Sequence, residues 1–175
     1  DCLEELGYQV KRKIGTTGVL GVIDSGVPGP ALALRADMDA LPFEVDGEST
    51  AIHACGHDAN CTMVLTAAKR AARRAVQTGK LFILFQQAEE VAGKGAFLMA
   101  QTGALSEIQE MVAVHLRPSQ DAVLGEAVAG IAHSAGYFVD IVIKGKTAHG
   151  SRPFMGVNAI EIASAIIQAA NGIRE

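Results

Sequence analysis

Residues 81–85 have the sequence Leu81-Phe-Ile-Leu-Phe85, a continuous apolar run between Gly79 and Gln86. Such a run is typical of a β-strand that is buried on both faces, as in a parallel sheet covered by helices. Shorter apolar runs of strand length lie at 19–23, 31–34 and 111–114. The sequence therefore predicts a sheet in which 81–85 is a buried strand.

Helical periodicity separates these runs. From residue 58 an apolar stripe recurs at helical spacing opposite a basic face, and a shorter helix is expected at 95–101. Alternation of strands and helices predicts an α/β fold, with a mixed, largely parallel sheet and helices on both of its faces.

The sequence changes character after Pro118, where 119–136 is rich in glycine and alanine. Beyond it, alternating apolar residues from Val139 to Lys144 predict a half-exposed strand. A helix is expected at 157–171 with an inward-facing stripe of Ile160, Ala163, Ile166, Ile167 and Ala170. We therefore expect one domain over 1–133 and the start of a smaller α+β domain over 134–175.

The composition excludes several classes of protein. The chain has 175 residues, 49% of them hydrophobic, and a formal net charge of −4. It shows no basic stripe with interleaved aromatics, and its apolar runs end before the ~18 residues of a membrane span. We expect no nucleic-acid or membrane partner. Three sparse cysteines favour the reducing cytoplasm over a disulfide framework.

The densest polar cluster is His53-Ala-Cys55-Gly-His57-Asp58. Imidazole and thiolate are ligands for zinc and neighbouring transition metals. Cys55 and His57 are two residues apart, so in an extended segment their side chains emerge on the same side. Asp58 is expected to cap the following helix or to hold a histidine tautomer. The alternative is a polar loop before a capped helix.

Polar side chains also follow three of the predicted strands. They are Asp37, Asp39, Glu89, Glu90 and His115. The carboxyl ends of strands in an open α/β sheet form the edge where ligands bind. At such an edge one carboxylate can bind a metal while its neighbour accepts a proton. Each residue alone could be a solvated acid or a core histidine, but together they predict a metal-dependent hydrolase.

Five segments resemble the amidohydrolase branch of the M20 metallopeptidases, which includes N-acyl-amino-acid, hippurate and auxin-conjugate hydrolases. The segments occur in the family's order and span nearly the whole chain. They are Arg35-Ala-Asp-Met-Asp-Ala-Leu-Pro42, His53-Ala-Cys-Gly-His-Asp58, Gln86-Gln-Ala-Glu-Glu90, Val114-His-Leu116 and Gly145-Lys-Thr-Ala-His-Gly-Ser-Arg-Pro153.

The resemblance implies a centre of two divalent metal ions (zinc, manganese, nickel or cobalt). Its ligands would be Cys55, His57, Glu90 and His115. Glu89 falls on the family's general base. The implied reaction is cleavage of the amide bond of N-acyl amino acids, or of related small conjugates, by metal-activated water.

Two further roles follow from the same resemblance. Asp39 matches an acid that contacts the metal ligands and does not itself bind the metal. His149 would lie in a lid and dimerisation domain and bind substrate or the developing oxyanion, often across a homodimer.

The chain also departs from the family pattern. Asn60 replaces a frequent histidine, Cys61 a common threonine and Gln87 a frequent proline. Members are about twice as long, so we expect a fragment that lacks the chain start, most of the lid and the segment with one more metal-ligating histidine. His133, the only spare histidine, does not match that position.

These departures keep two alternatives open. The chain could be a truncated or inactive paralogue that binds only a metal or a partner. It could also hold a single structural zinc through His53, Cys55, His57 and Cys61.

Overall fold

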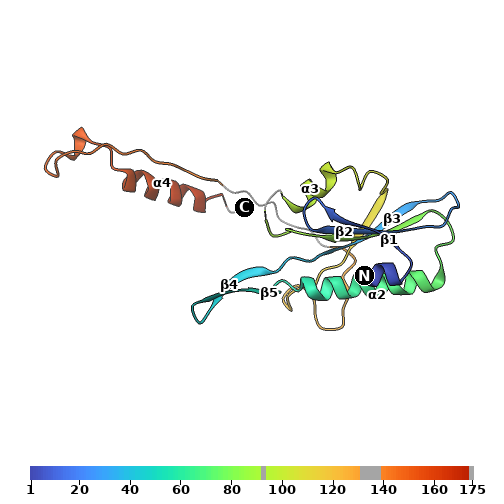
Figure 1. Cartoon of the computed structure of the whole chain (residues 1–175). Coiled ribbons are helices and arrows are strands. Elements are labelled where there is room, and N and C mark those ends of the chain that lie inside the picture. The colour runs from blue at the N-terminus through green and yellow to red at the C-terminus, as the bar shows by residue number, and fades with distance from the viewer. Residues whose placement is uncertain (92–93, 131–138, 174–175) are drawn as a thin grey trace. The chain divides into compact units, whose positions relative to one another are not determined.

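The computed structural model describes residues 1–91, 94–130 and 139–173. It divides the chain into two compact units, Asp1–Ala127 and Val128–Glu175 (Figure 1). The predicted boundary between 133 and 134 lies outside the described residues.

The first unit is built on a five-stranded mixed sheet of order β1-β2-β6-β3-β7. Strand β3 pairs in parallel with β6 and β7, whereas β2 pairs antiparallel with β1 and β6. The predicted run 81–85 is therefore the core of the middle strand. The strands are β1 (Gln9–Ile14), β2 (Gly18–Asp24), β3 (Ala31–Asp37), β6 (Lys80–Gln86) and β7 (Glu110–Ala113).

Helices cover both faces of this sheet, as the sequence predicts (Figure 1). Helices α1 (Cys2–Glu5) and α2 (His57–Arg74) pack on one face and α3 (Gly95–Gln101) on the other. Ile83 of β6 faces α2, and its neighbours Phe82 and Leu84 face α3, in the alternation of a strand buried on both sides. Among the described residues, no helix has the length and apolar character needed to cross a membrane.

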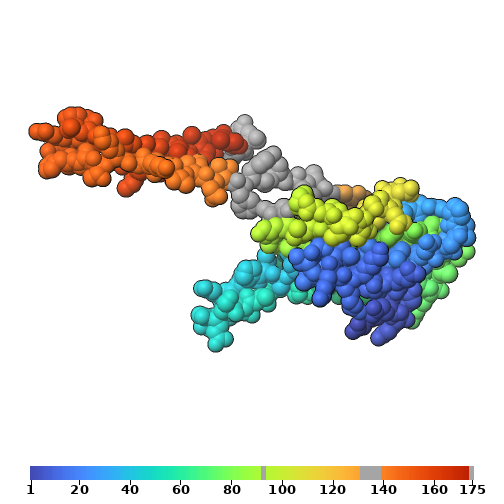
Figure 2. Space-filling view, turned by 45° about the horizontal axis from the view of Figure 1, so that its top comes forward, coloured from blue at the N-terminus to red at the C-terminus, as the bar shows by residue number. Residues whose placement is uncertain are grey.

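A hairpin that the sequence analysis did not predict leaves the first unit after β3. Its strands β4 (Leu41–Val45) and β5 (Glu48–Ile52) pair antiparallel and are largely exposed. The turn residues Asp46 and Gly47 both have positive φ, 53° and 82°, as in the two-residue turn that Asp-Gly favours. Figure 2 shows the hairpin projecting from the body of the unit.

The second unit holds the short helix η1 (Pro153–Met155) and α4 (Ala159–Asn171). The prediction of a strand from Val139 to Lys144 is wrong, because these residues form no β-ladder with any other described residue. A strand needs a hydrogen-bonded partner as well as the alternating pattern. The only bridge in the described part of this unit joins Lys146 to Val157.

The predicted helix at 157–171 forms as α4, and Asn158 caps it by accepting a hydrogen bond from the Ile160 amide at 3.1 Å. The expected inward stripe is not buried, since Ile160 and Ile167 are 79% and 63% exposed. In the described residues no element covers this face enough to bury any residue of α4.

The middle strand sets the stability of the first unit. Ile83→Ala should lower its free energy of unfolding by about 2–5 kcal/mol, because the fully buried side chain would leave a cavity between β6 and α2. Urea denaturation followed by circular dichroism measures this loss. The matched change Ile52→Ala, at a position 42% exposed, should cost less than about 1 kcal/mol. Equal losses would contradict this account of the core.

Candidate metal centre

The predicted polar residues meet at one edge of the sheet. The parallel strands β3, β6 and β7 end at the same edge, where Asp37, Glu89 and His115 lie at or just beyond their carboxyl ends. Helix α2 begins there as well, so His57 in its first turn and Cys55, just before the helix, lie at the same edge.

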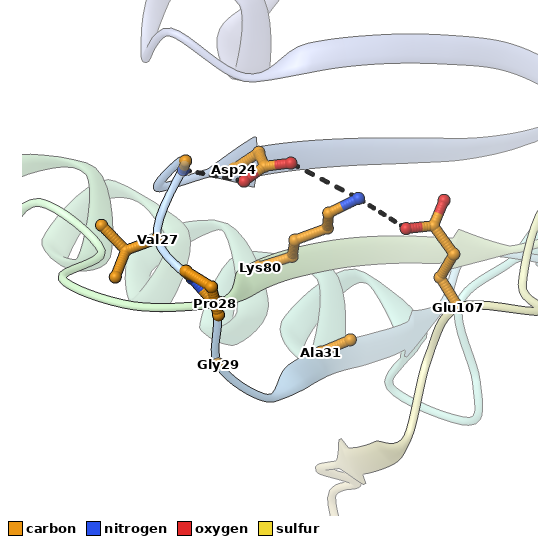
Figure 3. A pocket seen from close by; sticks show the side chains of 9 residues that line it. Asp24, Val27, Pro28, Gly29, Ala31, Lys80 and Glu107 are labelled. Carbon is orange, nitrogen blue, oxygen red and sulfur yellow. Dashed lines mark hydrogen bonds and ion pairs between the residues drawn. The ribbon is translucent and has the colours of Figure 1, made fainter.

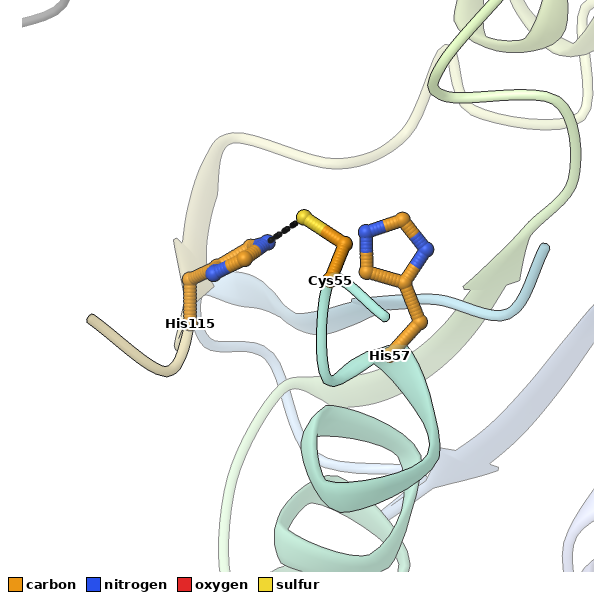
Figure 4. A group of neighbouring side chains, drawn as sticks. All are labelled: Cys55, His57 and His115. Atoms are coloured by element: carbon orange, nitrogen blue, oxygen red, sulfur yellow. Dashed lines mark hydrogen bonds between the residues drawn. The ribbon is translucent and has the colours of Figure 1, made fainter. Parts of the chain in front are cut away.

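Cys55, His57 and His115 face one another (Figure 4). The Cys55 Sγ atom is 3.7 Å from Nε2 of His115, and the two imidazole rings lie edge to face with centroids 5.4 Å apart. One ligand atom from each residue lies within 4.8 Å of the others, and a second such group joins Asp37, His57 and Glu89. His57 belongs to both groups and is their common member.

The tautomer of His57 follows from its contacts. Its Nδ1 lies 2.8 Å from the backbone oxygen of Asp39, and a carbonyl oxygen can only accept a hydrogen bond, so Nδ1 carries the proton. The Nε2 atom therefore presents a lone pair, and this buried atom has no hydrogen-bond partner among the described residues. Carboxylate oxygens surround it: Asp37 Oδ1 and Glu90 Oε1 at 3.8 Å, and Glu89 Oε2 at 3.9 Å.

His115 has the same arrangement. Its Nδ1 donates to the backbone oxygen of Leu116 at 2.6 Å, which leaves Nε2 as the atom that faces the Cys55 sulfur. Two imidazole lone pairs, a thiol and carboxylates directed at one volume are a donor set that suits divalent transition metals. The residues present therefore fit a metal ion.

Asp39 orients two of the candidate metal ligands, His57 and Glu90. Besides its backbone contact with His57, its Oδ2 accepts a hydrogen bond from the Glu90 amide at 3.0 Å. Burial alone would raise the pKa of Asp39, but hydrogen bonds from the backbone amides of Glu90 and Glu89 outweigh it and lower that pKa. Asp39 is therefore a carboxylate at neutral pH, and it orients one histidine and one glutamate together.

The Cys55 thiol is protonated at neutral pH in the absence of a cation. Its pKa is raised to about 11, first by burial and then by the neighbouring carboxylates Glu90, Glu89 and Asp37. A metal ion would reverse this balance, because a coordinated thiol loses its proton.

Asn60 and Asp37 form a buried link that the sequence analysis did not identify. Both are fully buried, and Asn60 Nδ2 donates to Asp37 Oδ1 at 2.7 Å. The Asn60 oxygen accepts from the Leu116 amide at 3.2 Å, next to His115. Arg35 also donates to Asp37, at 2.8 Å. Asn60 thus connects α2 to the ends of β3 and β7. The sequence signal that could have identified this link is the position of Asn60 in the first turn of the helix, three residues after His57.

Asp58 has neither of its two expected roles: it does not cap α2, and the histidine tautomers are set by the backbone oxygens of Asp39 and Leu116 instead. Gly56 occupies the N-cap position with φ 79°, and Asp58 lies exposed in the first turn of α2. No hydrogen bond or ion pair of its carboxylate occurs within the described part of the chain. A negative charge in the first turn of a helix still interacts favourably with the helix dipole and so stabilises α2.

His149 belongs to the second unit. Its Nδ1 accepts a hydrogen bond from the Ser151 amide at 3.2 Å and lies 2.9 Å from the Ser151 hydroxyl. Because Nδ1 is an acceptor, Nε2 carries the hydrogen and is available as a donor.

The structural zinc alternative does not match the geometry of the described residues. Cys61 donates to the backbone oxygen of Asp37 at 3.1 Å, and His53 is exposed. Neither residue belongs to a group of close ligand atoms.

Two hollows mark opposite ends of β3 and β6. One, of about 800 Å³, includes Asp39 and Glu90 in its lining. It therefore adjoins the metal-ligand cluster, which consists of Asp37, Cys55, His57, Glu89, Glu90 and His115. The other, of about 430 Å³, lies where these strands begin. There Lys80 is bound between Asp24 and Glu107 (Figure 3), so its charge is already neutralised.

A family model decides the relationship of this chain. The model for peptidase family M20/M25/M40 matches residues 33–171, which include every segment that lines the metal-ligand cluster. The chain belongs to this family.

Curated M20 relatives cover nearly all of the chain. IAA-amino acid hydrolase ILR1-like 2 of Arabidopsis thaliana is 37% identical over 94% of this chain and 39% of its own length. N-acetyl-L-cysteine deacetylase of Bacillus subtilis is 36% identical over 96% of this chain and 42% of its own length. Hippurate hydrolase of Campylobacter jejuni is 35% identical over 98% of this chain and 46% of its own length. The chain thus spans less than half the length of these relatives.

Solved M20 structures have the same fold. A dinuclear metal binding peptidase of the M20 family from Bacillus subtilis aligns with a TM-score of 0.59 and 30% identity. The alignment covers 67% of this chain and 35% of that protein. The expected α/β fold of the M20 catalytic domain is confirmed.

Metal retention tests the ligand cluster. Cys55→Ala should lower zinc affinity about 10-fold or more, because one donor of the set is lost. Atomic absorption of protein dialysed against buffered zinc measures the bound metal. Cys2→Ala, at an exposed position in α1, is the matched control and should retain the wild-type stoichiometry. Unchanged zinc binding by the Cys55 variant would exclude Cys55 as a ligand.

The buried link predicts a separate effect on folding. Asn60→Asp preserves the shape of the side chain but places a second carboxylate against Asp37, and it should cost about 3 kcal/mol or more at neutral pH. The loss should shrink as the pH falls from 7 to about 4, because repulsion from Asp37 raises the pKa of the new carboxyl in the folded state and the carboxyl takes up its proton within that interval. Urea unfolding at pH 7 and pH 4 measures both values. A pH-independent loss would show that charge repulsion is not its cause.

Proposed function

We propose that this chain is part of a metal-dependent amidohydrolase that cleaves the amide bond of N-acyl amino acids or related small conjugates. The observation that carries the proposal is the buried His57 Nε2 atom, which has no hydrogen-bond partner among the described residues and faces a thiol and carboxylates. A ligand set of this kind at the carboxyl edge of an α/β sheet supports a metal-assisted hydrolase.

The proposed ligands are Cys55, His57, Glu90 and His115, which would hold two divalent ions chosen from zinc, manganese, nickel and cobalt. When bound, such ions polarise a carbonyl and lower the pKa of water. The name of the M20 structure from Bacillus subtilis, a dinuclear metal binding peptidase, supports the number of ions.

Glu89 is the proposed general base. Its side chain is 40% exposed, so solvent and substrate can reach it, and its Oε2 lies 3.9 Å from Nε2 of His57. In the proposed reaction Glu89 accepts a proton from the attacking water and returns it to the leaving amine nitrogen. Asp39 keeps His57 and Glu90 oriented throughout, through the contacts described above.

The substrate class rests on two further points. Two relatives are named as an IAA-amino acid hydrolase and an N-acetyl-L-cysteine deacetylase, and both names describe removal of an acyl group from an amino acid. The hollow of about 800 Å³ beside Asp39 and Glu90 falls within the range of small-molecule sites.

We further propose that His149, through its Nε2–H, donates to the substrate or the developing oxyanion. It would act within a lid and dimerisation domain of a cytoplasmic homodimer.

A second candidate is a module that binds a metal or a partner without turnover. The length of the chain favours it, since the chain spans less than half of its curated relatives. The complete protein and this chain, each loaded with metal, separate the two: hydrolysis of N-acyl amino acids by the complete protein alone would assign the activity to the longer form.

Glu89→Gln tests the mechanism. In the complete protein it should keep metal binding and lower kcat by about 10²–10⁴-fold, because glutamine cannot accept the proton from water. Release of free amino acid from N-acyl substrates measures the rate, and metal analysis is run on the same samples. Glu44→Gln, at an exposed position in the hairpin, should leave both values unchanged. Near-normal turnover in the Glu89 variant would exclude it as the base.

A further inference from the structure

Three segments at the carboxyl edge of the sheet line the hollow of about 800 Å³. They are the β1–β2 turn, residues 38–42, which join β3 to β4, and the loop after β6. The turn lies at this edge because β2 runs antiparallel to β6, so that Val19 near the start of β2 pairs with Phe85 near the end of β6. The hollow and the metal-ligand cluster therefore share one edge, and Glu90 belongs to both.

Contacts between the three segments fix the walls of the hollow. The turn packs tightly on the loop after β6, since a Cβ atom at Gly15 or Gly18 would collide with a side chain of that loop. The Met38 amide donates to the backbone oxygen at the end of β6 at 2.9 Å, and the Glu90 amide donates to Asp39 Oδ2 at 3.0 Å. Walls joined in this way are formed before a ligand arrives, so little ordering cost opposes its binding.

The lining of the hollow is mostly apolar. Val91, one of its members, is 46% exposed, so the fold leaves part of this apolar surface in contact with water. A ligand group that covered such a surface would gain free energy in proportion to the apolar area that it buries. The apolar residues of the lining are Met38, Ala40, Leu41, Pro42, Ala88 and Val91.

The same lining offers no counter-charge to an anion. None of the described residues that line the hollow is a lysine, arginine or histidine, and its two charged members, Asp39 and Glu90, are acids. The turn contributes only the neutral Thr16 and Thr17. A metal ion held by Glu90 would supply positive charge on the side of the cluster alone. A carboxylate that leaves water for the rest of this surface would lose hydration without gaining an ion pair.

We propose that this hollow binds the acyl group of the substrate and selects large uncharged acyl groups over acyl groups that carry a carboxylate. The inference rests on the proposed amidohydrolase function and names the substrate class for it. An aromatic acyl group would cover the apolar walls, whereas an acetyl group would leave most of them exposed. A succinyl group would bring its carboxylate to a surface without a counter-charge.

Three amides that lack the amino-acid part of the substrate test this selection. Benzamide is large and neutral, acetamide is small and neutral, and 4-carbamoylbenzoate adds a carboxylate to benzamide. Titrations of this chain, with and without zinc, followed in ¹H–¹⁵N NMR spectra give each dissociation constant and identify the backbone amides that respond. We expect benzamide to bind about 10-fold more tightly than either of the other two. The largest shifts should come from residues of the lining, such as Thr16, Thr17 and Ala40.

Val91→Lys adds the missing counter-charge to the lining. It should tighten the binding of 4-carbamoylbenzoate by about 10-fold and change that of benzamide by less than about 3-fold. Thr17→Lys places the charge on the turn and should act in the same direction. Val45→Lys is the matched control, because Val45 is 47% exposed in the hairpin and outside the lining. This control adds the same net charge and should keep the wild-type preference.

Several results would overturn the proposal. In the wild type they are the absence of binding by all three amides, equal binding of benzamide and either other probe, and shifts confined to residues outside the lining. In the variants it is the absence of any gain for 4-carbamoylbenzoate with both lysines of the lining, or an equal gain with Val45→Lys. Failure of the proposed function is a different result: the complete, metal-loaded protein would not hydrolyse N-acyl amino acids, whatever the probes show.

Discussion

The hydrogen bond from His57 Nδ1 to the backbone oxygen of Asp39 is the contact on which the rest of the site depends. It sets the tautomer of a fully buried imidazole and directs the lone pair of Nε2 toward the thiol and the carboxylates. The same Asp39 holds the Glu90 amide with its carboxylate, so one residue orients donors from α2 and from the loop after β6. Without this contact the ring could rotate, and the two groups of ligand atoms would lose their common member.

The sheet brings these residues together. Three parallel strands end at one edge, and cores on both faces hold β6 between α2 and α3. Asn60 adds a polar connection across that edge, from α2 to Asp37 and to the backbone beside His115. A site built on packed strands and a helix start is held more rigidly than one built on loops alone.

Much of the fold could be predicted from local patterns. The run 81–85 and the stripe of α2 are strong signals, because a short continuous apolar run is typical of a buried strand and a stripe at helical spacing is typical of an amphipathic helix. The hairpin was missed, although Asp46-Gly47 is a turn signal and the sequence of β4 alternates, because its strands are short and bury almost nothing. The strand expected from Val139 to Lys144 failed for the opposite reason: its pattern is clear, but pairing depends on a partner that the local sequence does not specify.

The sequence by itself determined which side chains were available for chemistry and on which elements they lie: a cysteine and two histidines, with acids after the strands of a parallel sheet. Only the tertiary structure decided how they act, because tautomers, burial and unpaired atoms arise from contacts between distant segments. Asp37 and Glu89 are close to His57 only once β3, β6 and α2 have packed together. For the same reason the hollow beside the cluster could be recognised only after the β1–β2 turn, the segment after β3 and the loop after β6 had come together.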